Sequence, residues 1–158
     1  MAKVLIAYYS RSGNTEAMAR QVAKGAEGVG ATVEVKQVSN VTMEDLLAAD
    51  AIILGSPTYY GTMAAEVKDL LDRSVEIHGQ LEGKVGGAFA SAGGVGGGQQ
   101  TTIVDMLQAL LIHGMVVQGD PGGDHYGPVA VGKPDERSAK QCRRWGERLA
   151  TLAQRLNL

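Results

Sequence analysis

The chain has a single cysteine, no large excess of charge of either sign, and no long apolar run. Cys142 has no partner for an internal disulfide, which agrees with a reducing compartment. Lys and Arg total 15 against 17 Asp and Glu, a net charge of -2, so there is no basic patch of the kind that nucleic acid requires. With no membrane-length segment and no signal-peptide pattern, we expect a cytoplasmic protein that binds no nucleic acid and does not insert into a membrane.

The order of apolar segments predicts an α/β fold. The 158 residues are expected to form one domain, residues 1–158. Helical spacing separates apolar runs typical of strands, which cover residues 4–9, 32–38, 51–54, 84–92 and 115–117. Strands that alternate with helices pair in parallel through right-handed crossovers. We therefore predict a doubly wound, five-stranded parallel sheet in the order 2-1-3-4-5, with helices on both faces.

Three further segments have recognisable local patterns. Thr42 to Asp45 resembles a capping box ahead of a short helix. Residues 119–134 are rich in Gly and Pro and are predicted to form a loop. Residues 135–157 are predicted to form a closing helix, whose inward residues would be Ala139, Cys142, Leu149, Leu152 and Leu156.

A polar hexapeptide, Ser10-Arg11-Ser12-Gly13-Asn14-Thr15, joins the first strand to the first helix. The start of a helix has backbone N–H groups without intrahelical partners and a partial positive charge, so it attracts anions. Gly13 allows the backbone to curl, and the hydroxyl and amide side chains add donors. The hexapeptide predicts a phosphate site, although taken alone it fits a simple helix cap equally well.

Several phosphate-binding classes lack their signatures here. The hexapeptide contains neither G-x-x-x-x-G-K-[ST] nor G-x-G-x-x-G, which disfavours a nucleoside triphosphate or a dinucleotide at this turn. It has no cysteine nucleophile, which argues against a low-molecular-weight phosphatase. A phosphoacceptor receiver domain needs acidic residues where this chain has Ser10 and Ser56.

Two more unusual loops, residues 55–61 and 91–99, also follow predicted strands and should meet the hexapeptide at one edge of the sheet. Tyr59 and Tyr60 offer aromatic faces to a flat ligand, beside a stiffening Pro57 and a hydrogen-bonding Thr58. The glycines from Gly93 to Gly98 allow main-chain N–H groups to approach the edge of a ring. A monophosphate joined to a flat ring describes FMN.

The segments that carry this pattern resemble the flavodoxin superfamily, in particular its WrbA-type NAD(P)H:quinone oxidoreductases. They are residues 10–15, Ser56 to Gly61, Gly96 to Thr102, and His113-Gly114-Met115. The resemblance implies that the FMN phosphate is held by Ser10, Arg11, Ser12, Gly13, Asn14 and Thr15. It implies that one side of the isoalloxazine meets Pro57, Thr58, Tyr59, Tyr60 and Gly61. It assigns the pyrimidine edge to Ser91, Ala92, Gly93, Gly94, Gly96 and Gly97.

The same resemblance implies an oxidoreductase in which NADH or NADPH reduces FMN and a quinone or similar acceptor reoxidises it. The alternative is a flavodoxin-type carrier of single electrons between redox protein partners, and a weaker third is an FMN-binding sensor. Because a flavin performs the redox chemistry itself, we predict no catalytic side chain and no metal site. The family's insertions after the second and fifth strands are short or missing, so its tetramer and nicotinamide pocket are not carried over, and a homo-oligomer stays possible.

The roles of five single residues are also predicted. His125 and Tyr126 either stack on nicotinamide or shape a quinone site, or they decorate an exposed loop. His113 stands at the end of a helix, where capping is favoured over chemistry; the family commonly has a second histidine where this chain has Ile112. Cys142 is expected in the core, and Trp145 in packing or an interface.

Overall fold

The computed structural model describes residues 1–157, and in this part of the chain seven strands form one sheet. They are β1 (Lys3–Tyr8), β2 (Thr32–Gln37), β3 (Ala51–Tyr59), β4 (Thr62–Met63), β5 (Val85–Ala92), β6 (Val116–Val117) and β7 (Val129–Val131). Five parallel strands lie in the order β2-β1-β3-β5-β6. This confirms the predicted 2-1-3-4-5 arrangement. In addition, β4 pairs antiparallel with β3, and β7 pairs parallel with β5.

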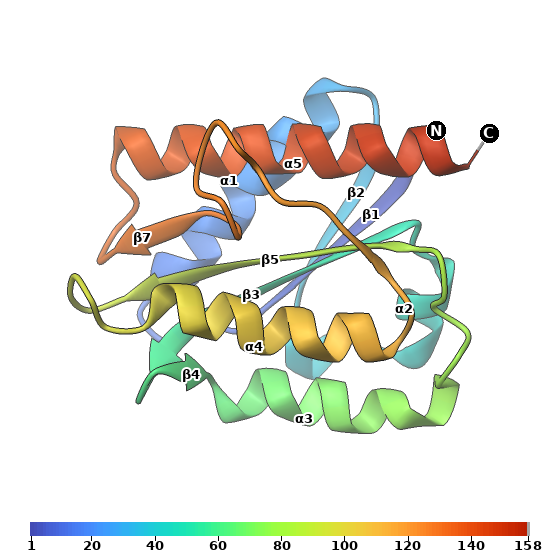
Figure 1. Cartoon of the computed structure of the whole chain (residues 1–158), viewed down its shortest axis with the longest axis horizontal. Helices are drawn as coiled ribbons and strands as arrows, with labels where there is room; N and C mark the ends of the chain where they lie inside the picture. Colours follow the sequence, from blue (N-terminus) through green and yellow to red (C-terminus); the bar gives the residue numbers. More distant parts are fainter. Residues whose placement is uncertain (158) are drawn as a thin grey trace.

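Helices cover both faces of the sheet, as Figure 1 shows. They are α1 (Asn14–Gly28), α2 (Met43–Ala48), α3 (Ala65–Arg73), α4 (Gln99–Ile112) and α5 (Glu136–Leu156), with short 3-10 helices η1 (Val38–Asn40) and η2 (Ser74–Ile77). Successive side chains of a strand point to opposite faces. Along β1, Val4 and Ile6 therefore pack under α1 and α5, while Leu5 and Ala7 pack under α2, α3 and α4. No helix within residues 1–157 is both long enough and apolar enough to cross a bilayer.

The helices α2 and α5 begin with capping boxes. Thr42 Oγ1 accepts from the Asp45 N–H at 3.1 Å, and Asp45 Oδ2 accepts from the Thr42 N–H at 2.9 Å. This confirms the predicted box. At α5, Asp135 and Ser138 make the same reciprocal pair. In each box, side chains satisfy one N–H group of the first turn and the N–H group of the capping residue.

The helices α1 and α5 touch through glycine. A side chain at Gly25 would overlap the Arg143 carbonyl, and one at Gly146 would overlap the carbonyl of Val22. Cys142 and Trp145 are buried beside this contact, as expected. Leu156 was expected to point inward, but it is 48% exposed. It lies in the last turn of α5, beyond the buried Ala153 and therefore past the packed part of the helix.

Two predicted loops contain strand. Residues 55–61 were expected to form a loop, but β3 continues to Tyr59 because Gly55, Ser56 and Pro57 pair with β5. Likewise, residues 119–134 contain β7, which pairs with Ala90 to Ala92. Because β6 pairs with the start of β5 and β7 with its end, the segment between them interrupts the fifth strand.

Candidate functional site

The structure brings the three predicted segments to one edge of the sheet. The strands β1, β3 and β5 are parallel neighbours, so the segments that follow them meet at their carboxyl ends. These are residues 9–13 before α1, the turn at 60–61 between β3 and β4, and residues 93–98 before α4. In Figure 1 this edge lies on the left, where α1, α4 and the β4 hairpin begin. A ligand held here would touch segments that are far apart in sequence.

The start of α1 has no side-chain cap. Gly13 precedes the helix with a φ of 95°, and its N–H donates to Ser10 Oγ at 3.1 Å. Within residues 1–157, no protein acceptor takes the N–H groups of Asn14, Thr15 and Glu16. In contrast to α2 and α5, the donors and the positive end of the α1 dipole are therefore available to an anion.

A buried hydroxyl pair lies directly behind this helix start. Thr15 and Ser91 are 1% and 4% exposed, and their hydroxyl oxygens lie 2.9 Å apart. Two hydroxyl groups bring two protons, but only one is used in their mutual hydrogen bond. Among the described residues, the second proton has no acceptor. A spare buried donor beside an uncapped helix start fits a phosphate group.

The hairpin between β3 and β4 presents aromatic side chains. Pro57 and Thr58 are half-buried in β3, Tyr59 is 36% exposed, and Tyr60 is fully exposed at the turn. Tyr60 has a φ of 50°, and it is the one non-glycine residue with a positive φ in residues 1–157. Gly61 follows with a φ of 80°. Two successive positive φ values are typical of tight two-residue hairpins, and they leave the Tyr60 ring accessible to a flat ligand.

The glycine segment, residues 93–98, contacts this hairpin at Gly61. Ser91 and Ala92 are buried at the end of β5, whereas residues 93–97 are exposed. Thr101 Oγ1 donates to the Gly61 carbonyl at 2.7 Å and also lies 2.9 Å from the carbonyl of Gly98. A Cβ atom at Gly98 would lie 2.8 Å from Gly61 Cα, so only glycine permits this approach.

Two residues at the start of α4, Thr101 and Thr102, were not among the predicted contacts, and Gly98 has a packing role beside them. Thr102 Oγ1 donates to Thr58 Oγ1 at 3.2 Å, which connects the start of α4 to β3 next to the hairpin turn. The sequence contained one sign of this contact: a glycine stands three residues before a threonine, at the point where apolar residues begin to recur at helical spacing. A hollow of about 470 Å³ borders this start, lined by Val95, Gly96, Gly98, Gln99, Gln100, Thr101 and Val129.

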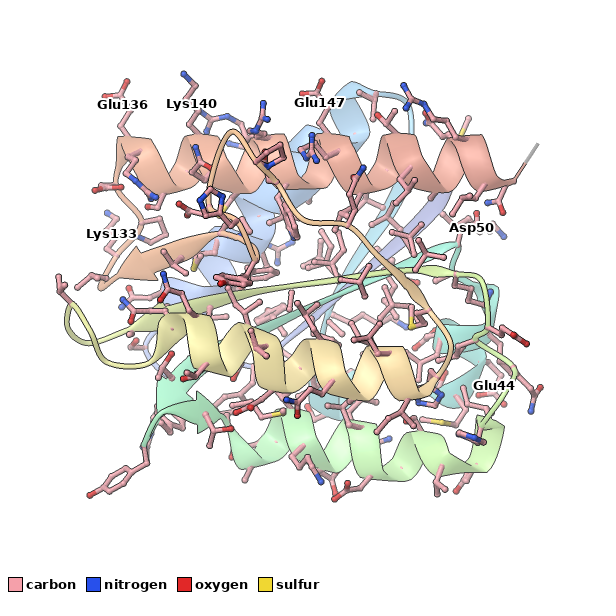
Figure 2. All side chains as sticks on the ribbon, viewed as in Figure 1. Glu44, Asp50, Lys133, Glu136, Lys140 and Glu147 are labelled. Atoms are coloured by element: carbon pink, nitrogen blue, oxygen red, sulfur yellow. The ribbon has the colours of Figure 1, made fainter. Side chains whose placement is uncertain are left out.

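The three segments themselves contain little charge. Segments 10–15, 57–63 and 91–100 contain one charged side chain, Arg11, which is exposed. Lys133 stands at the same edge, because it follows β7 and the neighbouring Gly132 N–H donates to the Ala92 carbonyl at 2.8 Å (Figure 2). No carboxylate belongs to these three segments themselves; Glu16 follows the first of them, and Asp105 Oδ2 accepts from Thr62 Oγ1 at 2.6 Å.

The loop that carries His125 and Tyr126 packs against α5. Asp120 is 3% exposed and accepts from Arg144 at 2.6 and 2.9 Å. These hydrogen bonds lower the pKa of Asp120 to about 2. His125 Nδ1 lies 2.8 Å from the Asp120 carbonyl, and Asp124 pairs with Arg137. This loop follows β6 and leads into β7.

His125 and Tyr126 are both exposed. A substrate contact by either one stays a prediction.

His113 lies at the far end of α4, away from the three segments. It is 7% exposed, with Nε2 2.8 Å from Ser74 Oγ. Ser74 Oγ itself donates to the Leu71 carbonyl at 2.6 Å, so it accepts the Nε2 proton. Burial lowers the pKa of His113, and electrostatic repulsion from His78 lowers it further. This environment agrees with the predicted structural role.

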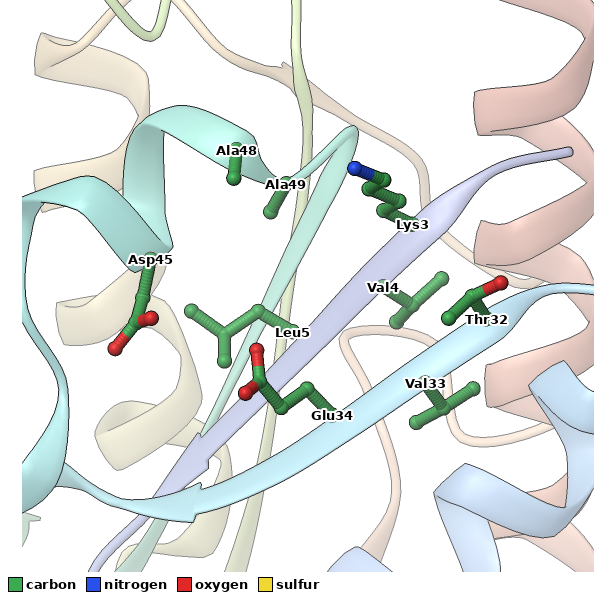
Figure 3. Close-up of a pocket in the computed structure, with 9 residues that line it drawn as sticks. All are labelled: Lys3, Val4, Leu5, Thr32, Val33, Glu34, Asp45, Ala48 and Ala49. Carbon is green, nitrogen blue, oxygen red and sulfur yellow. The ribbon is translucent and has the colours of Figure 1, made fainter.

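A second hollow, of about 410 Å³, lies where α2 leaves the first halves of β1 and β2 uncovered (Figure 3). Glu34 and Asp45 line it, and both carboxylates pair with Lys36 at 3.3 and 2.9 Å. Carboxylates disfavour a phosphate, and none of the predicted site residues lines this hollow. The described residues also hold no cluster of three His, Cys, Asp or Glu side chains suited to a metal ion.

Comparisons with known proteins show which family this chain resembles. Residues 40–122 match the family described as NADPH-dependent FMN reductase. A flavodoxin of Aquifex aeolicus is 40% identical over 159 residues, covering 95% of this chain and 86% of that protein. An NAD(P)H dehydrogenase (quinone) of Sinorhizobium fredii is 36% identical over 197 residues, covering 99% of both chains. The solved structure of a WrbA-like flavodoxin from Agrobacterium tumefaciens superposes with a TM-score of 0.85 at 28% identity, covering 98% of this chain and 99% of that one.

Proposed function

Because the chain belongs to the NADPH-dependent FMN reductase family, we propose that it binds FMN, oxidises NADH or NADPH, and passes two electrons to a quinone or a similar acceptor. A cytoplasmic location is part of the proposal. The two relatives named above correspond to the two candidate functions, an electron carrier and an enzyme, because one is called a flavodoxin and the other a quinone dehydrogenase.

The residues at the carboxyl edge suit FMN. The uncapped start of α1 and the spare hydroxyl proton of the Thr15 and Ser91 pair would hold the phosphate. Tyr59 and Tyr60 would lie along the ring, and the exposed glycine segment would offer main-chain N–H groups to its edge. When bound, FMN supplies the hydride and electron transfer, so the protein contributes binding, orientation and local charge.

The charge of the site is the observation that favours a nucleotide-dependent enzyme. NADH and NADPH carry a pyrophosphate, and their approach is favoured where the rim has Arg11 and Lys133 and no carboxylate in the three segments.

A one-electron carrier is the second candidate, and the length of the chain favours it. The alignment with the quinone dehydrogenase runs over 197 positions, although this chain has 158 residues. That relative therefore has segments that this chain lacks. Fewer segments around the ring leave it more accessible to a partner protein.

A stopped-flow experiment separates the two candidates. The oxidised holoprotein is mixed with NADH or NADPH, and the flavin absorbance is followed. The enzyme predicts rapid, complete bleaching and repeated turnover when benzoquinone is added. A flavin that neither nucleotide reduces, but that stepwise titration with dithionite converts to a blue one-electron-reduced form, refutes the enzyme and supports the carrier.

A further inference from the structure

Ser91 was assigned above to the pyrimidine edge of the flavin, but its contacts connect it to the opposite end of the ligand. Its hydroxyl lies 2.9 Å from that of Thr15, in the first turn of α1. Both side chains are more than nine-tenths buried. The pair joins the end of β5 to the helix start, although the two residues are 76 positions apart in sequence.

Thr15 lies in the first turn of α1, next to the free N–H groups; if it contacts the bound anion, the chemistry of hydroxyl groups fixes the direction of its hydrogen bond with Ser91. Each hydroxyl donates one proton and accepts through two lone pairs, whereas a phosphate oxygen only accepts. If Thr15 donated its proton to Ser91, it would present lone pairs to the anion, which is repulsive. Thr15 must therefore donate to the anion, and it can then only accept from Ser91.

We propose that Ser91 is a positioning residue for the FMN phosphate: its Oγ–H donates to Thr15 Oγ1 and thereby directs the Thr15 proton to the phosphate. The proposal rests on the proposed function only in taking FMN as the ligand, and it requires no reductase activity. Ser91 then acts through Thr15 and does not touch the ring. The two protons of the buried pair are both used only when the anion is present.

Titrations of the apoprotein with FMN and with riboflavin test this directly. Riboflavin has the same ring but no phosphate, so the ratio of the two affinities isolates the phosphate end. We expect Ser91→Ala to lower this ratio about three- to tenfold, the typical loss of one hydrogen bond. The affinity of the Ser91→Ala variant for riboflavin should stay unchanged. For Ser91→Cys, whose thiol is a weak donor, the affinity ratio should lie between that of Ser91→Ala and that of the unchanged protein.

Thr15 variants give the second half of the test. Thr15→Ser keeps the hydroxyl and should keep the ratio, whereas Thr15→Val should lower it. In the Thr15→Val background, Ser91→Ala should lower the ratio no further, because its effect passes through Thr15. Ser74→Ala is the matched control: Ser74 is 2% exposed and hydrogen-bonded, but lies at the other end of the sheet, and it should change neither affinity.

Two results overturn the proposal. If Ser91→Ala weakens FMN and riboflavin by the same factor, Ser91 contacts the ring. If it weakens neither ligand, the hydrogen bond has no role in binding. A failure of FMN to bind any variant, including the unchanged protein, refutes the proposed function as well, so the two failures are distinguishable.

Discussion

The glycine contact between α1 and α5 allows a quantitative prediction for Gly146→Ala. The added methyl group would overlap the Val22 carbonyl oxygen and lie 2.9 Å from the Ala26 nitrogen. These atoms are backbone, so α1 must move as a whole, and overpacking of this kind costs about 3 kcal/mol. Alanine returns about 1 kcal/mol through its higher helix propensity. The expected net loss of unfolding free energy is about 2 kcal/mol.

Urea denaturation measures this loss, with the fluorescence of Trp145 as the probe. Trp145 is the single tryptophan of the chain, and it is 2% exposed beside Gly146. A loss of about 2 kcal/mol corresponds to a decrease in melting temperature of about 4–8 °C for a domain of this size. The denaturant midpoint should fall while the slope stays constant.

Gly28→Ala is the matched control. Gly28 is the last residue of α1, and a Cβ atom there meets nothing within 4 Å. The same substitution should therefore stabilise the protein by about 0.5–1 kcal/mol. If Gly146→Ala is also neutral or stabilising, the helices are not in the close contact described, and the reasoning is refuted.

Four other perturbations have expected outcomes. The folded-state pKa of His113 is lowered from 6.5, so its contribution to stability is present above that pH and lost on acidification; His113→Gln should flatten the change of urea midpoint below about pH 6.5. Asp120→Asn should cost about 1–2 kcal/mol at neutral pH, because its arginine partners are partly exposed; in the unchanged protein this contribution, present above pH 3.8, should be lost as acid denaturation approaches pH 2. Burial raises the pKa of Cys142 to about 12, so a thiol reagent should label it only on unfolding, and fast labelling of the native protein would contradict its burial. At low salt, Lys133→Glu should slow reduction by NADPH several-fold while Lys140→Glu, on the outer face of α5 (Figure 2), should not; equal effects would argue against local steering.

The sequence allowed the order of the five parallel strands to be predicted. Long apolar runs are typical of strands buried on both faces of a sheet, which requires helices on both sides. Right-handed crossovers then leave few arrangements. The split of the fifth strand could not be predicted. Val129 to Val131 is three residues long and follows Pro128, and its strand conformation depends on pairing with β5. Short runs of this kind have no local periodicity to detect.

The candidate site shows the same division. Residues 10–15 could be identified locally, because a strand, a glycine and a helix start follow one another in sequence. The hydrogen bond between Thr15 and Ser91 depends on where β5 ends relative to β1, and the contact of Thr101 with Gly61 depends on how α4 meets the hairpin. Such contacts between distant segments follow from tertiary packing, which no local pattern encodes.

The packing of α1 against α5 also determines when the fold can be completed during synthesis. The apolar face of α1 is synthesised before every strand except β1, whereas the helix that covers it follows all seven described strands. Until α5 emerges, Met18, Val22 and Ala26 have no helix to pack against on that side. Contacts of such large sequence separation form late and slowly. The apolar face of α1 therefore stays without its covering helix until α5 has been synthesised.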